Sequence, residues 1–336
     1  MTLAVGCGPV SVRTSSAGGP PALEDLDRYR RELTGYCYRM LGSGFEAEDA
    51  VQETMVRAWR AIDGFEGRSA VRSWLYRIAT NVCLDMLRSR QRRARPMDLG
   101  PSSTADSSLG APLPEVTWVQ PIPDDRVLPE DGDPAELAAA RETIRLAFVT
   151  ALQHLPPRQR AVLILREVLR WRATEVAELL DTTVASVNSA LQRARATLAA
   201  RDVEATASVT DAGQQELIAR YVDAFERYDV SALVKLLHDD AVMSMPPFPL
   251  WLVGPQEISR FFLGQGIGCQ GSKLVATSAN GCAAFACYHS DGNGGYTPWS
   301  IQVIEVSGDR IVGHHNFLDT RLFAVFGLPA HLPPGS

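Results

Sequence analysis

The side chains with the clearest chemical capability lie in the stretch "EVAELLDTTVASVNSALQRARATLAA", residues 175–200. Its pattern predicts two short helices joined at Asp181 and Thr182, with Thr182 capping the second helix. Hydroxyl, amide and guanidinium groups would share the outer face of that helix: Ser186, Asn188, Ser189, Gln192 and Arg193. Such side chains let a helix enter a DNA major groove and bond base edges. The stretch therefore predicts a helix-turn-helix, although a helical hairpin with a solvated face would give the same pattern.

The apolar residues of this stretch are expected to face the rest of the domain. They recur at helical spacing and are listed here in chain order: Val176, Ala177, Leu180, Val184, Val187 and Leu191. The arginines further along the second helix suit DNA phosphates, which supply affinity without sequence information.

Charge is distributed unevenly along the chain, although the formal net charge of its 336 residues is −6. Residues 68–95 contain eight arginines and one acid, Asp85, whereas residues 96–140 contain nine acids and only Arg126. Residues 141–201 hold ten arginines against five acids. Two basic blocks separated by an acidic spacer predict two nucleic-acid contacts joined by a linker.

The elements that would carry the first basic block are three helices. Apolar residues recur at helical spacing over residues 23–41 and 46–62, and again after Ser69, which fits an N-cap position. Trp59 falls on the apolar stripe of the second helix. Three helices of this length can bury one small core, so residues 22–95 are predicted to form an all-α domain.

The spacer over residues 96–135 contains eight prolines and almost no apolar periodicity, a composition that predicts neither helix nor core. One cluster within it, "EVTWVQPIPDD", places Trp118 beside valine and isoleucine. Such a tryptophan either docks onto another surface or belongs to an ordered loop.

Several classes of protein are disfavoured by what the sequence lacks. The six cysteines form no C-x-x-C pair and have no metal-ligand spacing, which favours free buried thiols in a reducing cytoplasm: positions 7, 37, 83, 269, 282 and 287. There is no apolar run of about 18 residues, so no membrane span is expected. Residues 1–21 lack the pattern of a signal peptide and are predicted to be a disordered leader.

The residue pattern changes after residue 210, where an amphipathic helix precedes several segments with the composition of β-strands. The expected strands are residues 273–279, 282–289, 299–306 and 310–318. "VSGDRIV" at 306–312 is a hairpin signal with Gly-Asp at its turn. Residues 211–332 are therefore predicted to form an α+β domain.

Two long segments resemble a known family. "EAEDAVQETMVRAWRAIDGFEGRSAVRSWLYRIATNVCLDMLRSRQRR" resembles region two of an extracytoplasmic-function (ECF) sigma factor, and "LPPRQRAVLILREVLRWRATEVAELLDTTVASVNSALQRARATL" resembles region four. Together they cover about 140 residues in the family's order. The last domain resembles a SnoaL-like cone-shaped α+β barrel, on its pattern and on "HNFLDTRLFAVFGLP".

The resemblance implies a role for each motif. The helix of Asp49, Gln52, Glu53 and Arg57 would bind the polymerase clamp, although a solvated acidic face fits these residues equally well. The loop Gly64–Arg68 and the helix behind it would read the melted minus-ten element with these residues: Phe65, Ser69, Arg72, Arg77 and Asn81. The outward residues of the helix-turn-helix would read the minus-thirty-five duplex.

Catalysis in the SnoaL-like domain would need acid and base groups that converge in its cone. The candidates are His238, Asp239, Asp240, His289, His315 and Asp319. The first three are expected at a helix end, where capping explains them, and the two remaining histidines are expected on strands as hydrogen-bonded wall residues. Regulation of the DNA-binding regions in cis is therefore favoured over catalysis.

The sequence thus predicts two all-α sigma domains followed by an α+β SnoaL-like barrel. Region two spans residues 22–95, the linker 96–135, region four 136–202 and the SnoaL-like domain 211–332. Core RNA polymerase and promoter DNA are the expected partners, no cofactor, metal or membrane is expected, and a small-molecule ligand of the cone is left open. The alternatives are a SnoaL-type cyclase or hydrolase fused to a DNA-binding module, and an activator that works without core polymerase.

Overall fold

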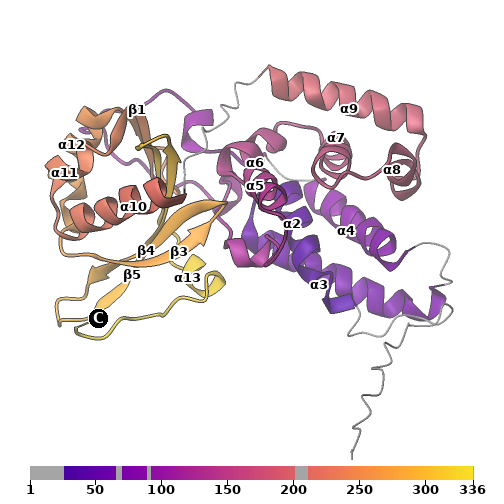
Figure 1. Cartoon of the computed structure of the whole chain (residues 1–336), viewed down its shortest axis with the longest axis horizontal. Coiled ribbons are helices and arrows are strands. Elements are labelled where there is room, and N and C mark those ends of the chain that lie inside the picture. The colour runs from indigo at the N-terminus through magenta and orange to yellow at the C-terminus, as the bar shows by residue number, and fades with distance from the viewer. Residues whose placement is uncertain (1–25, 66–69, 89–91, 201–210, 336) are drawn as a thin grey trace, which may run out of the picture.

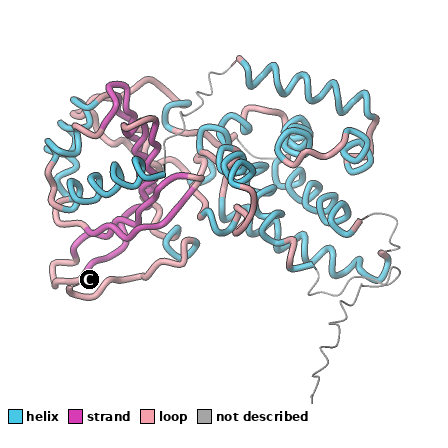
Figure 2. The backbone as a smooth tube through the Cα atoms, in the orientation of Figure 1, coloured by secondary structure: helices cyan, strands magenta, loops and turns pink. Residues whose placement is uncertain are grey.

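The computed structural model describes residues 26–65, 70–88, 92–200 and 211–335, so the expected leader lies outside it. A helical half and a half built on a β-sheet lie side by side (Figure 1), and irregular segments connect them (Figure 2). None of the described helices is both long and apolar enough to cross a membrane.

Three helices in the early part of the described chain pack against one another: α2 (Arg30–Leu41), α3 (Gly44–Ala61) and α4 (Val71–Leu87). Gly42 ends α2 with a φ of 72°, and the Ser43 hydroxyl begins α3 by accepting a hydrogen bond from the Glu46 amide. Ala70 occupies the N-cap position of α4. The serine expected there, Ser69, lies outside the described residues.

Trp59 does not belong to this core, and the prediction that it packs inward is wrong. Its side chain is 57% exposed, whereas the neighbouring Ala58 is fully buried. The apolar stripe of α3 is narrow, and adjacent residues of a helix point in directions about 100° apart. Ala58 therefore faces the core, whereas Trp59 faces outward.

Five helices and a π-helical turn form the second helical unit: α5 (Pro134–Glu142), α6 (Leu146–Gln153), α7 (Pro157–Leu163), Ile164–Val168, α8 (Ala173–Leu179) and α9 (Val184–Ala199). Thr183, not Thr182, caps α9 through its hydroxyl, because Asp181 takes a left-handed φ of 49° and shifts the turn by one residue. Val184 is consequently exposed rather than buried, and Leu179 packs inward beside Val187.

The acidic spacer does contribute to the core, contrary to the sequence expectation. It forms three 3-10 turns: Pro96–Asp98, Glu115–Thr117 and Asp124–Arg126. Trp118, Val119 and Ile122 are 1–2% exposed. Prolines prevent a periodic helix, but they do not prevent burial, because the backbone of this segment bonds to elements distant in sequence, such as Gly42 and Ala94.

The second half is a six-stranded sheet in the order β2-β1-β6-β5-β4-β3. The strands are β1 (Leu237–Ser244), β2 (Trp251–Val253), β3 (Lys273–Ala279), β4 (Cys282–Ser290), β5 (Tyr296–Ser307) and β6 (Arg310–Phe317). The helices are α10 (Asp211–Glu226), α11 (Val230–Val234), α12 (Pro255–Leu263) and α13 (Leu322–Val325). The four predicted strands and the hairpin at Gly308 are confirmed.

Each face of the sheet packs against a different partner. Phe285 and Cys287 on β4 join the core under α10 and α12, whereas Ala284 and Ala286 join the core shared with the helical half. This alternation follows from the two-residue period of a strand. His238, Asp239 and Asp240 lie on β1 as exposed residues, not at a helix end, because the preceding helix α11 already ends at Val234.

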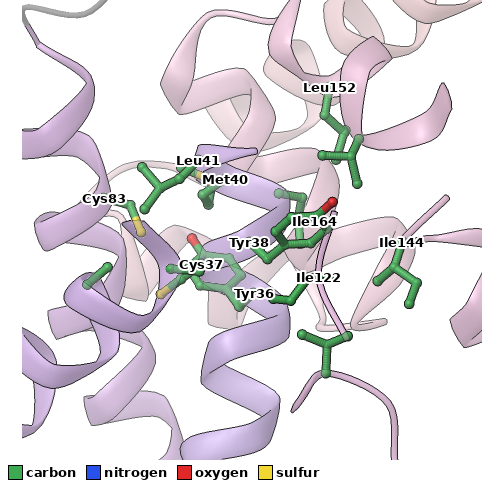
Figure 3. Close-up of a cluster of buried hydrophobic side chains, with 14 of the residues drawn as sticks. Tyr36, Cys37, Tyr38, Met40, Leu41, Cys83, Ile122, Ile144, Leu152 and Ile164 are labelled. Carbon is green, nitrogen blue, oxygen red and sulfur yellow. The ribbon is translucent and has the colours of Figure 1, made fainter. Parts of the chain in front are cut away.

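One continuous hydrophobic core joins the two helical units, the spacer and the face of the sheet that carries Ala284 and Ala286. Figure 3 shows Tyr38 of α2 beside Ile122 of the spacer, Ile144 before α6 and Ile164 of the π-helical turn. The two helical units, the spacer and the sheet domain are therefore packed together.

Candidate nucleic-acid interface

The outer face of α9 is open to solvent. All five side chains expected to read a duplex are exposed: Ser186, Asn188, Ser189, Gln192 and Arg193. Residues three, four and seven apart share a helix face, so these side chains form one surface. Val187, Leu191 and Ala194 hold the opposite face of α9 against α7 and α8. The helix thus presents donors and acceptors without unpacking anything.

The candidates for melted DNA are less free, because two arginines of α4 contact the helix-turn-helix unit. Arg77 Nη2 donates a hydrogen bond of 3.1 Å to the carbonyl oxygen of Glu178 in α8. The Arg72 guanidinium lies 5.4 Å from the centroid of the Trp171 ring and pairs with Glu32 at 2.9 Å. Two residues expected to bind DNA therefore bind the protein itself.

Two of the remaining minus-ten candidates, Phe65 and Asn81, fall within the described residues. The Phe65 ring packs at 5.0 Å from the Trp74 ring, which fixes the end of the loop that follows α3. Asn81 is exposed on α4. Ser69 lies outside the described residues, so the structure describes Phe65, Arg72, Arg77 and Asn81 of this set.

The polymerase candidates lie along one side of α3. Asp49, Gln52 and Arg57 are exposed. The Arg57 guanidinium forms an exposed ion pair at 2.7 Å with the carboxylate of Glu53, one helical turn earlier. Gln52 lines a groove of about 1410 Å³ between α2, α3, the spacer and α5. The exposed Trp59 lies two turns beyond Gln52 on the same face, a feature that helical periodicity alone did not reveal.

A hairpin tip of the SnoaL-like domain enters the helical half. Asn280, which joins β3 to β4 with Gly281, is fully buried and has a left-handed φ of 56°. Its side-chain nitrogen donates 2.6 Å hydrogen bonds to the Tyr38 hydroxyl and the Ile144 carbonyl oxygen. Its side-chain oxygen accepts from the Ile122 amide at 3.1 Å. One amide group therefore joins region two, the spacer and the segment before α6.

The residues flanking this tip complete the contact. The Gly281 amide donates to Asp124 Oδ1 at 2.8 Å, and a Cβ atom on Gly281 would come within 3.0 Å of the Arg141 carbonyl oxygen. Burial raises the pKa of the Asp124 carboxyl to about 6, against the lowering effect of the Gly281 amide. The Asn-Gly pair between two strands is the sequence signal that could have located this hairpin tip.

Two neighbouring histidines of β6 point to opposite faces of the sheet. His314 lies under α10, where it bonds to the Tyr221 hydroxyl, and burial lowers its pKa to about 3. His315 lies on the opposite face, between the Ser244 hydroxyl at 2.9 Å and the Glu305 carboxylate at 3.4 Å. Burial alone would raise the pKa of Glu305, but His315, Arg95 and Arg145 lower it to about 2. His315 therefore lies on the face of the sheet that packs against the helical half, opposite to the face under α10.

The other catalytic candidates are also apart from one another. His289 stacks on the exposed Trp299 ring at 4.2 Å, and burial lowers the pKa of this histidine. Asp319 binds Arg321 at 2.6 Å. Within the described part of the chain, these groups do not converge on one point, and no group of three potential metal ligands is found.

Comparisons with known proteins match all three parts. The models for Sigma-70 region 2, Sigma-70 region 4 and a SnoaL-like domain match residues 26–93, 145–198 and 218–314. The ECF RNA polymerase sigma factor SigG of Mycobacterium tuberculosis is 44% identical over 96% of this chain and 90% of that protein. SigW of Bacillus subtilis is 30% identical over 56% of this chain and 92% of its own length.

A solved structure also covers nearly the whole chain. The crystal structure of the extracytoplasmic-function sigma factor SigJ of Mycobacterium tuberculosis matches 92% of this chain and 100% of its own, with a TM-score of 0.58 and 23% identity. At that identity the likeness supports the fold: helical sigma domains followed by a sheet-containing SnoaL-like domain.

Proposed function

Because the chain belongs to the ECF RNA polymerase sigma factors, we propose that it binds core RNA polymerase and directs it to promoter DNA from the cytoplasm. In this role α3 binds polymerase, α4 and the loop before it bind the melted minus-ten strand, and α9 reads the minus-thirty-five duplex. The exposed amide, hydroxyl and guanidinium groups of α9 support the last assignment, because they match the donors and acceptors of base edges.

The single observation that carries the proposal further is the contact between Arg77 and α8. Two promoter elements about 25 base pairs apart are separated by about 85 Å of B-DNA. Helices that touch each other cannot contact both elements at once. The closed arrangement is therefore a resting form, and the sigma regions separate when polymerase and promoter bind.

The SnoaL-like domain stabilises this resting form in cis, and Asn280 is the residue through which it does so. The Asn280 side chain bonds to both sigma regions and the spacer in a fully buried position. Breaking such bonds leaves buried backbone groups without partners, at a cost of about 1–3 kcal/mol for each group. The domain acts as a restraint rather than as an enzyme, since its catalytic candidates have separate partners: His289 stacks on Trp299, whereas His315 contacts Ser244.

Run-off transcription with core polymerase on a library of promoter fragments tests the proposal. The full-length chain is expected to support specific initiation, and Arg77→Ala together with Asn81→Ala is expected to abolish it. If the full-length chain and the Asn280→Gly variant both fail to initiate at any fragment, the proposal is wrong.

A further inference from the structure

The spacer also contacts the SnoaL-like domain far from Asn280, along the edge formed by β2, α12 and the turn at Gln265. The Ser103 amide donates to the Trp251 carbonyl oxygen at 2.8 Å, and the Ala105 amide donates to Glu257 Oε2 at 2.6 Å. Gln265 Nε2 donates to the Ala105 carbonyl oxygen at 2.8 Å and to that of Ser107 at 2.9 Å. These bonds all go to the main chain of the spacer, as in many complexes of proteins with short peptides. The bound residues form a turn, in which the Ser107 amide donates to the Thr104 carbonyl oxygen at 3.0 Å.

Two side chains of the spacer fit this edge in a residue-specific way. Ala105 is 4% exposed and belongs to the core cluster under α10 and α12, so the site accepts a small apolar side chain there. Asp106 is exposed and pairs with Arg260, which also contacts Glu257 at 2.8 Å. The site therefore selects a small residue followed by a carboxylate.

We propose that this edge, defined by Trp251, Glu257, Arg260 and Gln265, is a peptide-binding site and that residues 103–107 are its tethered, releasable ligand. The Ala105 amide and then Arg260 lower the pKa of Glu257, as expected for a carboxylate that serves as the acceptor of the site. No cofactor or catalytic step is involved.

The contact is weak enough to be released. Over residues 103–107 it consists of one buried methyl group, a few hydrogen bonds and an exposed ion pair, and exposed pairs contribute little. Its flanks add a bond from Trp251 Nε1 to the Gly100 carbonyl oxygen, the packing of Leu109, and a bond from the Leu113 amide to the Pro247 carbonyl oxygen. A flexible tether supplies an effective concentration on the order of millimolar, which keeps a weak ligand bound until something competes for it. The part of the spacer at Trp118 and Ile122, by contrast, is deeply buried and anchors the other end.

Release would change how far the sigma regions can separate, a consequence that rests on the proposed function. Residues 99–117, which precede the buried anchor, would span up to about 65 Å as an extended chain. Bound along the sheet edge, these residues cannot extend. Peptide release would therefore add this length to the distance over which the two sigma regions can separate.

Peptide binding to the full-length chain tests the site without any promoter or polymerase. A fluorescent synthetic peptide of residues 99–110 is titrated against the wild type, Ala105→Arg and the control Ser102→Arg, which adds the same charge at an exposed position. Because the tethered copy competes only when it is bound, Ala105→Arg is expected to bind the peptide at least tenfold more tightly than the wild type and the control. Hydrogen exchange at Ser103 reports whether the spacer was released.

A charge exchange supplies a second, independent variant that leaves the buried alanine intact. Asp106→Arg places two cations together and is expected to speed exchange of the Ser103 and Ala105 amides about threefold to fivefold. Adding Arg260→Asp is expected to restore protection. The proposal is overturned if the released Ala105→Arg chain does not bind the peptide, if neither variant releases the spacer, or if the exchanged pair restores nothing. A loss of transcription alone would contradict the proposed function as a sigma factor, and it would not affect the conclusion about peptide binding.

Discussion

Asn280 Nδ2 lies 2.6 Å from the hydroxyl oxygen of Tyr38, a residue 242 positions earlier in the chain, and donates a hydrogen bond to it. The acceptor belongs to the region-two helices and the donor to the SnoaL-like domain. Tyr38 in turn donates to the Gln120 carbonyl oxygen at 2.8 Å, and burial raises its pKa well above the usual tyrosine range. The Tyr38 hydroxyl oxygen therefore accepts the Asn280 hydrogen bond only while the hairpin tip is inserted.

Asn280→Gly is expected to loosen the closed form while preserving the left-handed backbone, which glycine adopts without strain. The Ile122 amide and the Ile144 carbonyl oxygen lose their partner, so closure weakens by about 1–3 kcal/mol for each group, or about fivefold to 150-fold per group in the equilibrium. Small-angle scattering should show a larger radius of gyration, and run-off transcription at limiting protein should rise. Asn293→Gly in an exposed loop is the matched control. An unchanged radius and unchanged transcription would contradict the restraint.

The pKa of Asp124 predicts that closure depends on pH. Because burial raises this pKa from 3.8 to about 6, the closed form binds a proton more readily than the open form between these values. Closure is therefore most favourable below about pH 4 and weakens as the pH rises through about 6. Asp124→Asn should remove this dependence while keeping an acceptor for the Gly281 amide. Scattering measured from pH 5 to 8 checks the trend, and a wild type that opens on acidification would contradict it.

Much of the fold could be predicted from the sequence, because strand alternation and helical spacing are local signals. The hairpin at Gly308 and the outward face of α9 are examples. The burial of Trp118 could not be predicted, since the residue that it pairs with, Ala94, lies outside the spacer and no local pattern links the two. The same holds for Asn280, whose local signal indicates a turn but not the residues that surround it.

The face of α9 yields a prediction about specificity. Gln192→Ala should remove an amide that can pair with a base edge, costing about 1–3 kcal/mol at the preferred duplex and much less at other duplexes. Thr197→Ala on the same helix is the control, because its hydroxyl bonds only to the local Arg193 carbonyl oxygen among the described contacts. Competition binding with a randomised duplex library measures the change. A uniform loss across all duplexes would assign Gln192 to phosphate contact instead.

Asn81 offers the sharpest distinction between duplex binding and promoter opening. Its exposed side chain on α4 is proposed to hold an unstacked base, whereas α9 alone holds the intact duplex. Asn81→Ala should therefore reduce permanganate reactivity at the minus-ten element by on the order of tenfold or more, because base capture is worth about 1–3 kcal/mol. Gel-shift affinity for the closed promoter complex should change by less than about twofold.

Arg88→Ala, at the exposed end of the same helix, should instead weaken both readouts together and reduce the salt dependence, as expected for a phosphate contact. Equal losses of opening and duplex binding in Asn81→Ala would remove this residue from the base pocket and leave α4 as a purely electrostatic surface.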